Sequence, residues 1–250
     1  MTQNLPSTQV YSLEDVKVDV RNQMIEFNNA LLNTLHKKTL SEIKNAFTSA
    51  AVVTNYGAMY FKVEQLDRLL RTGNSGAAGY MWQHGIHGFS SGATPYQLGQ
   101  DICISAADFL ALVEARIQTT FGKPNIYLKY VKALYSTISS LPVFQDLRTV
   151  FASNIEQQRS QLKAQRIATY HVQRCEFTDH QFASQSEVQF AHIDSVVMNP
   201  LQALNIDNGV IIMREIHAKL TALNIHDFAG MYDFCEQNHY SIVWAENYYK

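Results

Sequence analysis

Two histidines and one asparagine near the end of the chain have the residue types of a hydrolytic site. Asn208 follows His192 by 16 residues, and His217 follows Asn208 by 9. A neutral imidazole can take a proton from water near pH 7, and its nitrogen can also bind a metal ion. An asparagine amide both donates and accepts hydrogen bonds, which suits it to fixing a loop. We therefore predict that His192, Asn208 and His217 form one site.

The sequence around these residues predicts the elements that position them. Residues 187–193 alternate like a strand, residues 209–213 form a short β-rich run, and residues 214–223 have a helical pattern. Two paired strands followed by a helix would bring a histidine at a strand end and a histidine in the first helical turn to the same side. One imidazole could then act as general base while the other holds a cation. Gly209 is expected to permit a backbone turn that other residues resist.

These segments resemble the HNH nuclease family and, within it, the restriction-endonuclease-like branch. The matching text is Cys175-Glu-Phe-Thr178, Val188-Gln-Phe-Ala-His-Ile193, Asp207-Asn-Gly-Val-Ile-Ile-Met213 and Glu215-Ile-His217, and the resemblance covers residues 170–225. It implies a ββα-metal fold in which His192 deprotonates the attacking water, Asn208 orients the loop and His217 binds a divalent metal ion. That ion, Mg²⁺ or Mn²⁺, would bind a phosphate oxygen and the departing 3′ oxygen.

Two positions depart from the family's pattern. Thr221 stands where many relatives have a second metal ligand, four residues after the helix histidine, and Ala191 precedes the expected base. One histidine does not hold Mg²⁺ alone, and this hard cation prefers oxygen ligands. Asp207 enters our prediction as the second metal ligand, with Asp194 and Asn224 as alternatives among which the sequence does not choose.

The rest of the chain has mostly helical patterns. Apolar residues recur at helical spacing in 12–35, 41–53, 61–70, 105–120, 126–139 and 144–167. Most of the glycines lie between Gly73 and Gly99, which predicts a long loop. The predicted fold class is mainly α with a small C-terminal α+β module. Residues 1–169 would form a helical DNA-binding domain with the glycine-rich loop 73–99, and residues 170–250 an HNH-like ββα-metal nuclease domain.

The net charge of −2 hides an uneven distribution. Between Arg116 and Arg174 there are nine basic residues and two acidic ones. A phosphate backbone requires such a concentration of positive charge, although solvated helix faces balanced by acidic neighbours would have the same composition. The predicted DNA-binding residues are Lys123, Lys129, Lys132, Arg148, Arg159 and Lys163.

Length and composition exclude several classes of protein. With 46% hydrophobic and 17% charged residues, the 250-residue chain is globular and not a disordered charged tail. It has no apolar stretch of the length that spans a membrane, so we expect no membrane partner. Its 3 cysteines are widely spaced without a CxxC pair, which argues against a disulfide framework and a four-cysteine zinc site. A cytoplasmic protein is the expectation.

These observations predict a metal-dependent endonuclease that hydrolyses DNA phosphodiester bonds, of the type II restriction kind. Its partner would be double-stranded DNA, and a palindromic target would imply a homodimer. The alternative is a catalytically degenerate HNH-module protein that acts as a DNA-binding or protein-interaction factor. Thr221 and Ala191 favour this alternative, and an RNA substrate stays open.

Overall fold

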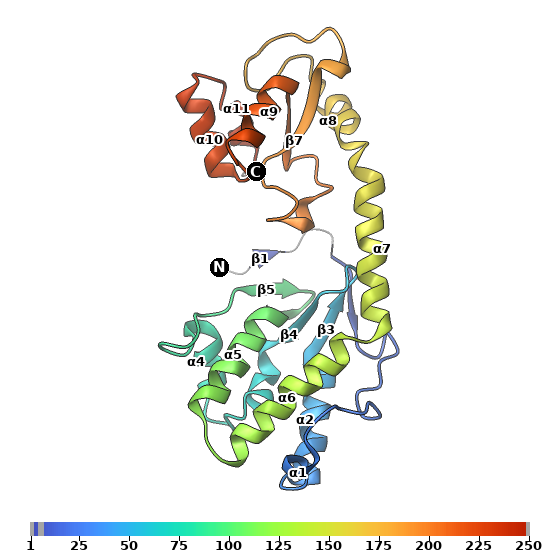
Figure 1. The fold of residues 1–250 in the computed structure, drawn as a ribbon, viewed down its shortest axis with the longest axis vertical. Helices are drawn as coiled ribbons and strands as arrows, with labels where there is room; N and C mark the ends of the chain where they lie inside the picture. Colours follow the sequence, from blue (N-terminus) through green and yellow to red (C-terminus); the bar gives the residue numbers. More distant parts are fainter. Residues whose placement is uncertain (1–2, 5–7, 249–250) are drawn as a thin grey trace. The chain divides into compact units, whose positions relative to one another are not determined.

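The computed structural model describes residues 3–4 and 8–248, and the chain forms two compact units (Figure 1). Unit 1 comprises residues 1–151 and unit 2 residues 152–250. The boundary falls within helix α7 (Pro142–Arg159). The sequence predicts the change of domain between residues 169 and 170. In the structure α8 (Leu162–Tyr170) belongs instead to unit 2, together with the C-terminal elements.

Unit 1 is built on a six-stranded sheet in the order β1-β5-β6-β4-β3-β2. β1 pairs with β5 in parallel, and the other neighbours are antiparallel. The strands are β1 (Gln3–Asn4), β2 (Val10–Ser12), β3 (Ala51–Thr54), β4 (Met59–Lys62), β5 (Pro95–Leu98) and β6 (Asp101–Ser105).

The two faces of this sheet pack into different clusters, as the alternation of side chains along a strand requires. Val53, Phe61 and Ile104 belong to the main core, which also contains apolar side chains of α2 (Lys37–Ala50), α5 (Ala106–Thr119) and α6 (Lys123–Ser139). Their neighbours Tyr60 and Cys103 belong to a smaller cluster on the opposite face. Aromatic rings pack against one another within the main core. Phe61 and Phe109, for example, form a stacked pair with ring centroids 4.0 Å apart.

The predicted fold class, mainly α with a C-terminal ββα-metal module, is wrong. Unit 1 has a six-stranded sheet where we predicted a helical domain, and the two-stranded sheet of unit 2 is packed with helices α8–α11. The error has a physical source: β3 and β4 are four-residue strands that are almost wholly buried, so their apolar residues do not alternate with polar ones. Periodicity cannot separate such runs from buried helical segments.

Several local predictions failed for related reasons. The stretch 12–35 contains only the short helix α1 (Asn29–Leu32), although Ser12 and Asp15 exchange the hydrogen bonds of a helix cap around a turn. Within the predicted helix 61–70, β4 is followed by η1 (Val63–Gln65) and α3 (Leu66–Leu69). The predicted glycine-rich loop contains α4 (Ala77–His84) and β5.

Unit 2 surrounds a second, separate core. Its two-stranded sheet pairs β7 (Val188–His192) with β8 (Gly209–Met213), and β8 leads directly into α9 (Arg214–Ala222). α10 (Phe228–Gln237) and α11 (Val243–Tyr248) follow. Two 3₁₀ turns, η2 (Gln185–Glu187) and η3 (Pro200–Gln202), flank β7. The core joins Phe177, Ile212 and Trp244.

The three cysteines are buried and free. Burial raises the pKa of Cys103 and of Cys235 to about 12, which leaves both as unreactive thiols at neutral pH. Within residues 3–4 and 8–248, no helix is both long and apolar enough to cross a membrane.

Candidate functional site

The sheet of unit 2 brings His192 and Asn208 together. His192 ends β7 and pairs with Gly209, the first residue of β8, so that Asn208 lies one residue from the paired position. Antiparallel pairing alone therefore places two residues 16 positions apart in the sequence beside each other. α9 starts immediately after β8 and carries His217 in its first half.

Asn208 fixes the long connection between the two strands. Its side chain is almost completely buried, with 1% of the residue exposed. The Oδ1 atom accepts a hydrogen bond from the Asp194 N–H at 2.9 Å, and Nδ2 donates to the carbonyl oxygens of Asp194 at 3.0 Å and Gln202 at 3.3 Å. Three hydrogen bonds from one amide tie the first residue of the loop 194–207, and Gln202 within it, to the start of β8.

Gly209 is required for packing and not for an unusual turn. Its φ angle is not positive, so the backbone freedom of glycine, which we had expected to matter, is not used. A Cβ atom at this position would clash with the ring of Phe190. The Phe190 ring, which occupies this space, also makes an edge contact with His192 at a centroid distance of 5.0 Å. The lack of a side chain at Gly209 thus leaves room for the Phe190 ring beside His192.

The His192 imidazole is held in one tautomer by a backbone carbonyl. Its Nε2 atom lies 2.9 Å from the Ala203 carbonyl oxygen. Because a carbonyl only accepts, Nε2 carries a proton, and in the neutral ring Nδ1 carries the lone pair. Burial lowers the pKa of His192, the hydrogen bond to Ala203 opposes that shift, and the nearby charges of Arg159 and His217 lower the pKa further. The ring is therefore a neutral base at pH 7.

His192 and His217 line the same open pocket, which has a volume of about 850 Å³. Burial lowers the pKa of His217 as well. A third histidine, His226, also lines the pocket. The charged side chains that line the pocket are all cationic: Arg159, Lys163 and Arg214. Among its described lining residues there is no aspartate or glutamate. The charged side chains that line the pocket therefore give it a positive potential.

Apolar side chains form another wall of this pocket. Phe190, Leu220 and Ile225 contribute to it, and the loop after β7 adds Val197 and Met198. Val197 is 91% exposed and Met198 72% exposed, so these two side chains border the opening. The pocket thus combines positive charge with apolar contact area.

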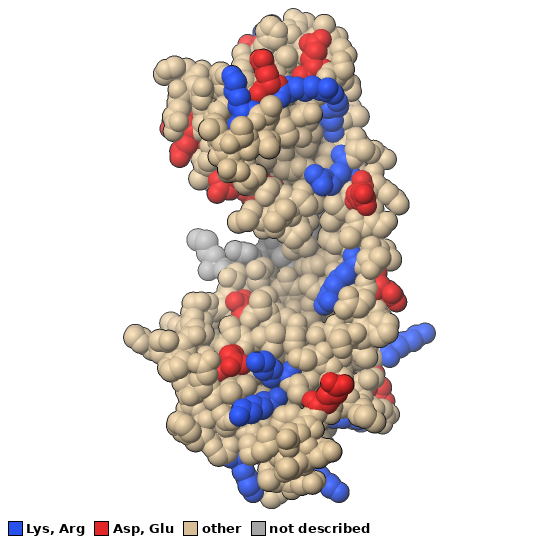
Figure 2. Space-filling view, viewed as in Figure 1, with Lys and Arg blue, Asp and Glu red and all other residues tan. Residues whose placement is uncertain are grey.

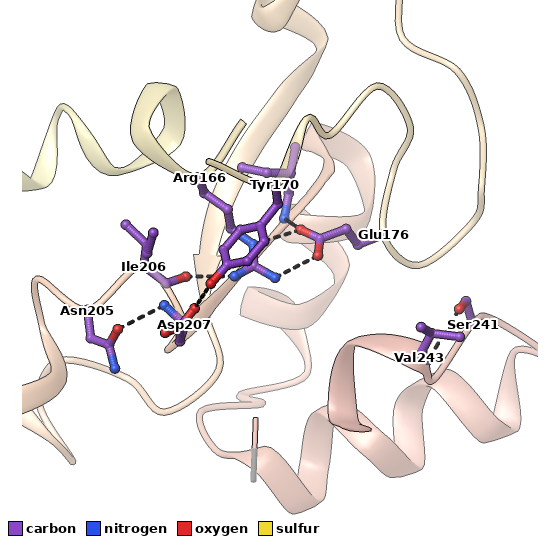
Figure 3. Close-up of polar contacts among 9 residues, drawn as sticks. Arg166, Tyr170, Glu176, Asn205, Ile206, Asp207, Ser241 and Val243 are labelled. Carbon is purple, nitrogen blue, oxygen red and sulfur yellow. Dashed lines mark hydrogen bonds and ion pairs between the residues drawn. The ribbon is translucent and has the colours of Figure 1, made fainter. Parts of the chain in front are cut away.

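Asp207, the predicted second metal ligand, faces a different group. Its Oδ1 atom accepts a hydrogen bond from the Tyr170 hydroxyl (Figure 3). The side chain does not line the pocket. The alternative Asp194 accepts from the Phe228 N–H at 3.3 Å and the Tyr248 hydroxyl at 2.5 Å. Asn224, the third candidate, has a left-handed backbone just beyond α9 and does not line the pocket either.

A resident Mg²⁺ ion does not fit this set of donors. Nowhere in the described part of the chain do three His, Cys, Asp or Glu side chains gather in an arrangement that could hold a metal ion. The Thr221 hydroxyl, at the position of the family's second ligand, donates to the His217 carbonyl at 3.0 Å. A hard cation needs several oxygen ligands, and the pocket offers cationic side chains instead.

A buried ion pair that sequence reasoning missed supports the loop before Asn208. Arg166 donates from Nε and Nη2 to both carboxylate oxygens of Glu176, at 2.9 and 2.6 Å, and from Nη1 to the Ile206 carbonyl at 2.7 Å (Figure 3). Glu176 also accepts from the Ile211 N–H in β8 at 2.5 Å. Glu176 lies in the Cys-Glu-Phe-Thr segment that we had singled out, but only the fold brings Arg166 to it.

The predicted DNA-binding residues separate into two groups. Arg159 and Lys163 line the pocket of unit 2, whereas Lys123, Lys129, Lys132 and Arg148 belong to unit 1. There, Lys132 forms an ion pair with Glu114 at 2.7 Å, and Arg148 donates to the Gly57 carbonyl at 3.1 Å. On the face drawn in Figure 2, Lys and Arg side chains lie in separate places with acidic side chains among them. Arg214, which the sequence reasoning had not selected, belongs to the pocket.

Comparisons with known proteins add no relationship: no family model, curated protein or solved structure matches this chain.

Proposed function

We propose that the pocket of unit 2 binds the phosphodiester backbone of DNA and hydrolyses it, as an endonuclease does. The observation that carries this proposal is the convergence of His192, His217 and three cationic side chains on one open pocket. The sequence resemblance to HNH nucleases over residues 170–225 supports the same activity. Association as a homodimer on double-stranded DNA and a cytoplasmic location stay predictions.

In the proposed reaction His192 is the general base. Its Nδ1 atom takes a proton from water as the water oxygen forms a bond to phosphorus, and the bond from phosphorus to the leaving oxygen breaks. The leaving oxygen takes a proton from solvent, and His192 later returns its own proton to solvent. A base of this kind contributes about 10²–10⁴-fold to the rate.

The cations of the pocket would stabilise the transition state. The attacked phosphate gains negative charge as the new bond forms, and Arg159 and Arg214, which line the pocket, would neutralise it. His217 would contact the same phosphate, because it shares the pocket with His192 and affects the pKa of that ring. Asn208 is a positioning residue, which acts through the loop that it binds.

A cleavage assay with a matched histidine variant tests this proposal. Supercoiled plasmid and labelled oligonucleotides are incubated with the full chain in Mg²⁺, in Mn²⁺ and in chelator. We expect cleavage that His192→Ala reduces by about 10²-fold or more. His180→Ala is the control, because His180 is exposed and outside the pocket. Intact DNA under all three conditions, or equal cleavage by the two variants, contradicts the proposal.

The absence of pocket carboxylates among the described lining residues favours a second function, binding of DNA without cleavage. In that case labelled oligonucleotides bind, His192→Ala changes the affinity little, and no product appears. Competition between DNA and RNA oligonucleotides of one sequence decides which nucleic acid the pocket prefers.

A further inference from the structure

We propose that the pocket of unit 2 binds a phosphate anion without a divalent cation, with Arg159, Lys163 and Arg214 supplying the positive charge. This inference rests on the proposed function for its biological ligand, but it concerns the pocket itself. It separates this chain from the HNH nucleases that it resembles in sequence, in which a metal ion neutralises the phosphate.

The first support is the state of two carboxylates and one hydroxyl that were candidates to complete a metal site with His217. Asp194 accepts from a backbone N–H and from a tyrosine hydroxyl, and Asp207 accepts from Tyr170. Thr221 donates to the helix backbone. These side chains hold the loop and the helix in place, so turning one of them toward a metal ion would break contacts that shape the pocket.

The second support is how the three cations are presented. Arg159 ends α7, Lys163 is the second residue of α8 and Arg214 begins α9, so three different elements contribute positive charge to one pocket. The Lys163 ammonium is fixed by the carbonyl oxygens of Gln185 at 2.9 Å and Val188 at 3.3 Å. Arg214 is exposed, and within the described chain its guanidinium has no hydrogen bond or ion pair. An arginine in this state can bind two oxygens of a phosphate.

The third support is electrostatic. Burial is the largest cause of the lowered pKa of His192, and the positive charge of Arg159 lowers it further by repelling a proton on that ring. A divalent cation placed between the two histidines would meet the same repulsion with twice the charge. An anion would instead be attracted by all three side chains, and it would arrive without needing a metal ion to accompany it.

Calorimetry with Mn²⁺ alone tests whether the pocket binds a divalent cation. The full chain is titrated with MnCl₂, and His217→Ala is titrated in parallel. We expect no binding in the micromolar range for either protein. Micromolar Mn²⁺ binding by the native chain that disappears in His217→Ala overturns the proposal, whatever the protein does to DNA.

Anion binding measured in the presence of a chelator tests whether the pocket holds phosphate without a metal ion. Pyrophosphate and a labelled oligonucleotide are titrated in EDTA and in Mg²⁺, with Arg214→Gln as the test variant, Arg214→Lys as the charge-retaining variant and Arg174→Gln as the remote control. We expect the affinity in EDTA to be at least as high as in Mg²⁺, since Mg²⁺ competes for the phosphates, and a loss of about 10-fold or more in Arg214→Gln. The dependence of log K on log salt for the oligonucleotide should also fall by about 1 in that variant. Arg214→Lys should recover part of the affinity.

The outcomes separate the inference from the proposed function. Binding in EDTA without DNA cleavage keeps the anion site and removes the nuclease. Cleavage that requires Mg²⁺ together with oligonucleotide binding that requires Mg²⁺ keeps the nuclease and overturns the metal-independent site. No binding of pyrophosphate or oligonucleotide in EDTA, or equal effects of Arg214→Gln and Arg174→Gln, also overturns it.

Discussion

Replacing Glu176 by Gln should destabilise unit 2 strongly, because it removes one member of a buried ion pair. The Arg166 side chain is 6% exposed and that of Glu176 is 19% exposed. One oxygen of Glu176 accepts from Arg166, and the other accepts from both Arg166 and the Ile211 N–H. Glutamine has the same shape, but either orientation of its amide turns an N–H₂ group toward at least one of these donors.

Removing one partner of a buried pair costs about 3–5 kcal/mol, since the remaining charge is left without compensation. We therefore expect Glu176→Gln to lower the free energy of unfolding by about that amount. Urea denaturation measures this free energy, with the fluorescence of Trp244 as the signal, because Trp244 lies in the core of unit 2. A Trp82→Phe background removes the other tryptophan, which lies in unit 1.

The control is the exposed pair of Arg174 and Asp179, whose side chains are 55% and 77% exposed. Asp179→Asn should change the free energy of unfolding by no more than about 1 kcal/mol, because water screens such pairs. Asparagine tolerates the left-handed backbone found at this position. Equal and small effects of Glu176→Gln and Asp179→Asn would refute the reasoning, since they would mean that the Arg166–Glu176 pair is hydrated.

Other perturbations test the loop, the packing and the titration of the site. Asn208→Ala removes three hydrogen bonds and should lower the free energy of unfolding in urea by about 3 kcal/mol, with Asp194 left partly unpaired. Gly209→Ala places a methyl group against the Phe190 ring and should cost about 1–3 kcal/mol in the same assay, and a smaller loss in the Phe190→Leu background would identify the clash. Burial lowers the pKa of His192 in the folded chain, so the unfolded chain binds more protons just below pH 6.5. The free energy of unfolding should therefore fall as the pH falls through that range. A His192→Gln variant should lose less stability over the same range. If its pH dependence equals that of the native chain, the lowered pKa of His192 is contradicted.

Local sequence patterns were sufficient for the pieces around the site. The alternation in residues 187–193 and the β-rich run at 209–213 correspond to β7 and β8, and the pattern after residue 213 corresponds to α9. For β7 and α9 the pattern works because an element with one buried face repeats its apolar residues with its own period. β8 is almost wholly buried, and its run of β-branched residues identified it instead. In unit 1 the buried strands β3 and β4 lack this contrast, so the same reasoning predicted helices there.

The sequence by itself determined which groups can do chemistry here: a pair of histidines, an amide between them and an excess of basic residues between Arg116 and Arg174. Only the tertiary structure decided that Arg159, Lys163 and Arg214 meet His192 and His217 in one pocket, while Asp194 and Asp207 are engaged by tyrosines elsewhere. The physical reason is that a side chain's type follows from the sequence, but its partner depends on packing between elements distant along the chain. Residues that resemble a metal centre in sequence can thus fold into a pocket lined by cationic side chains.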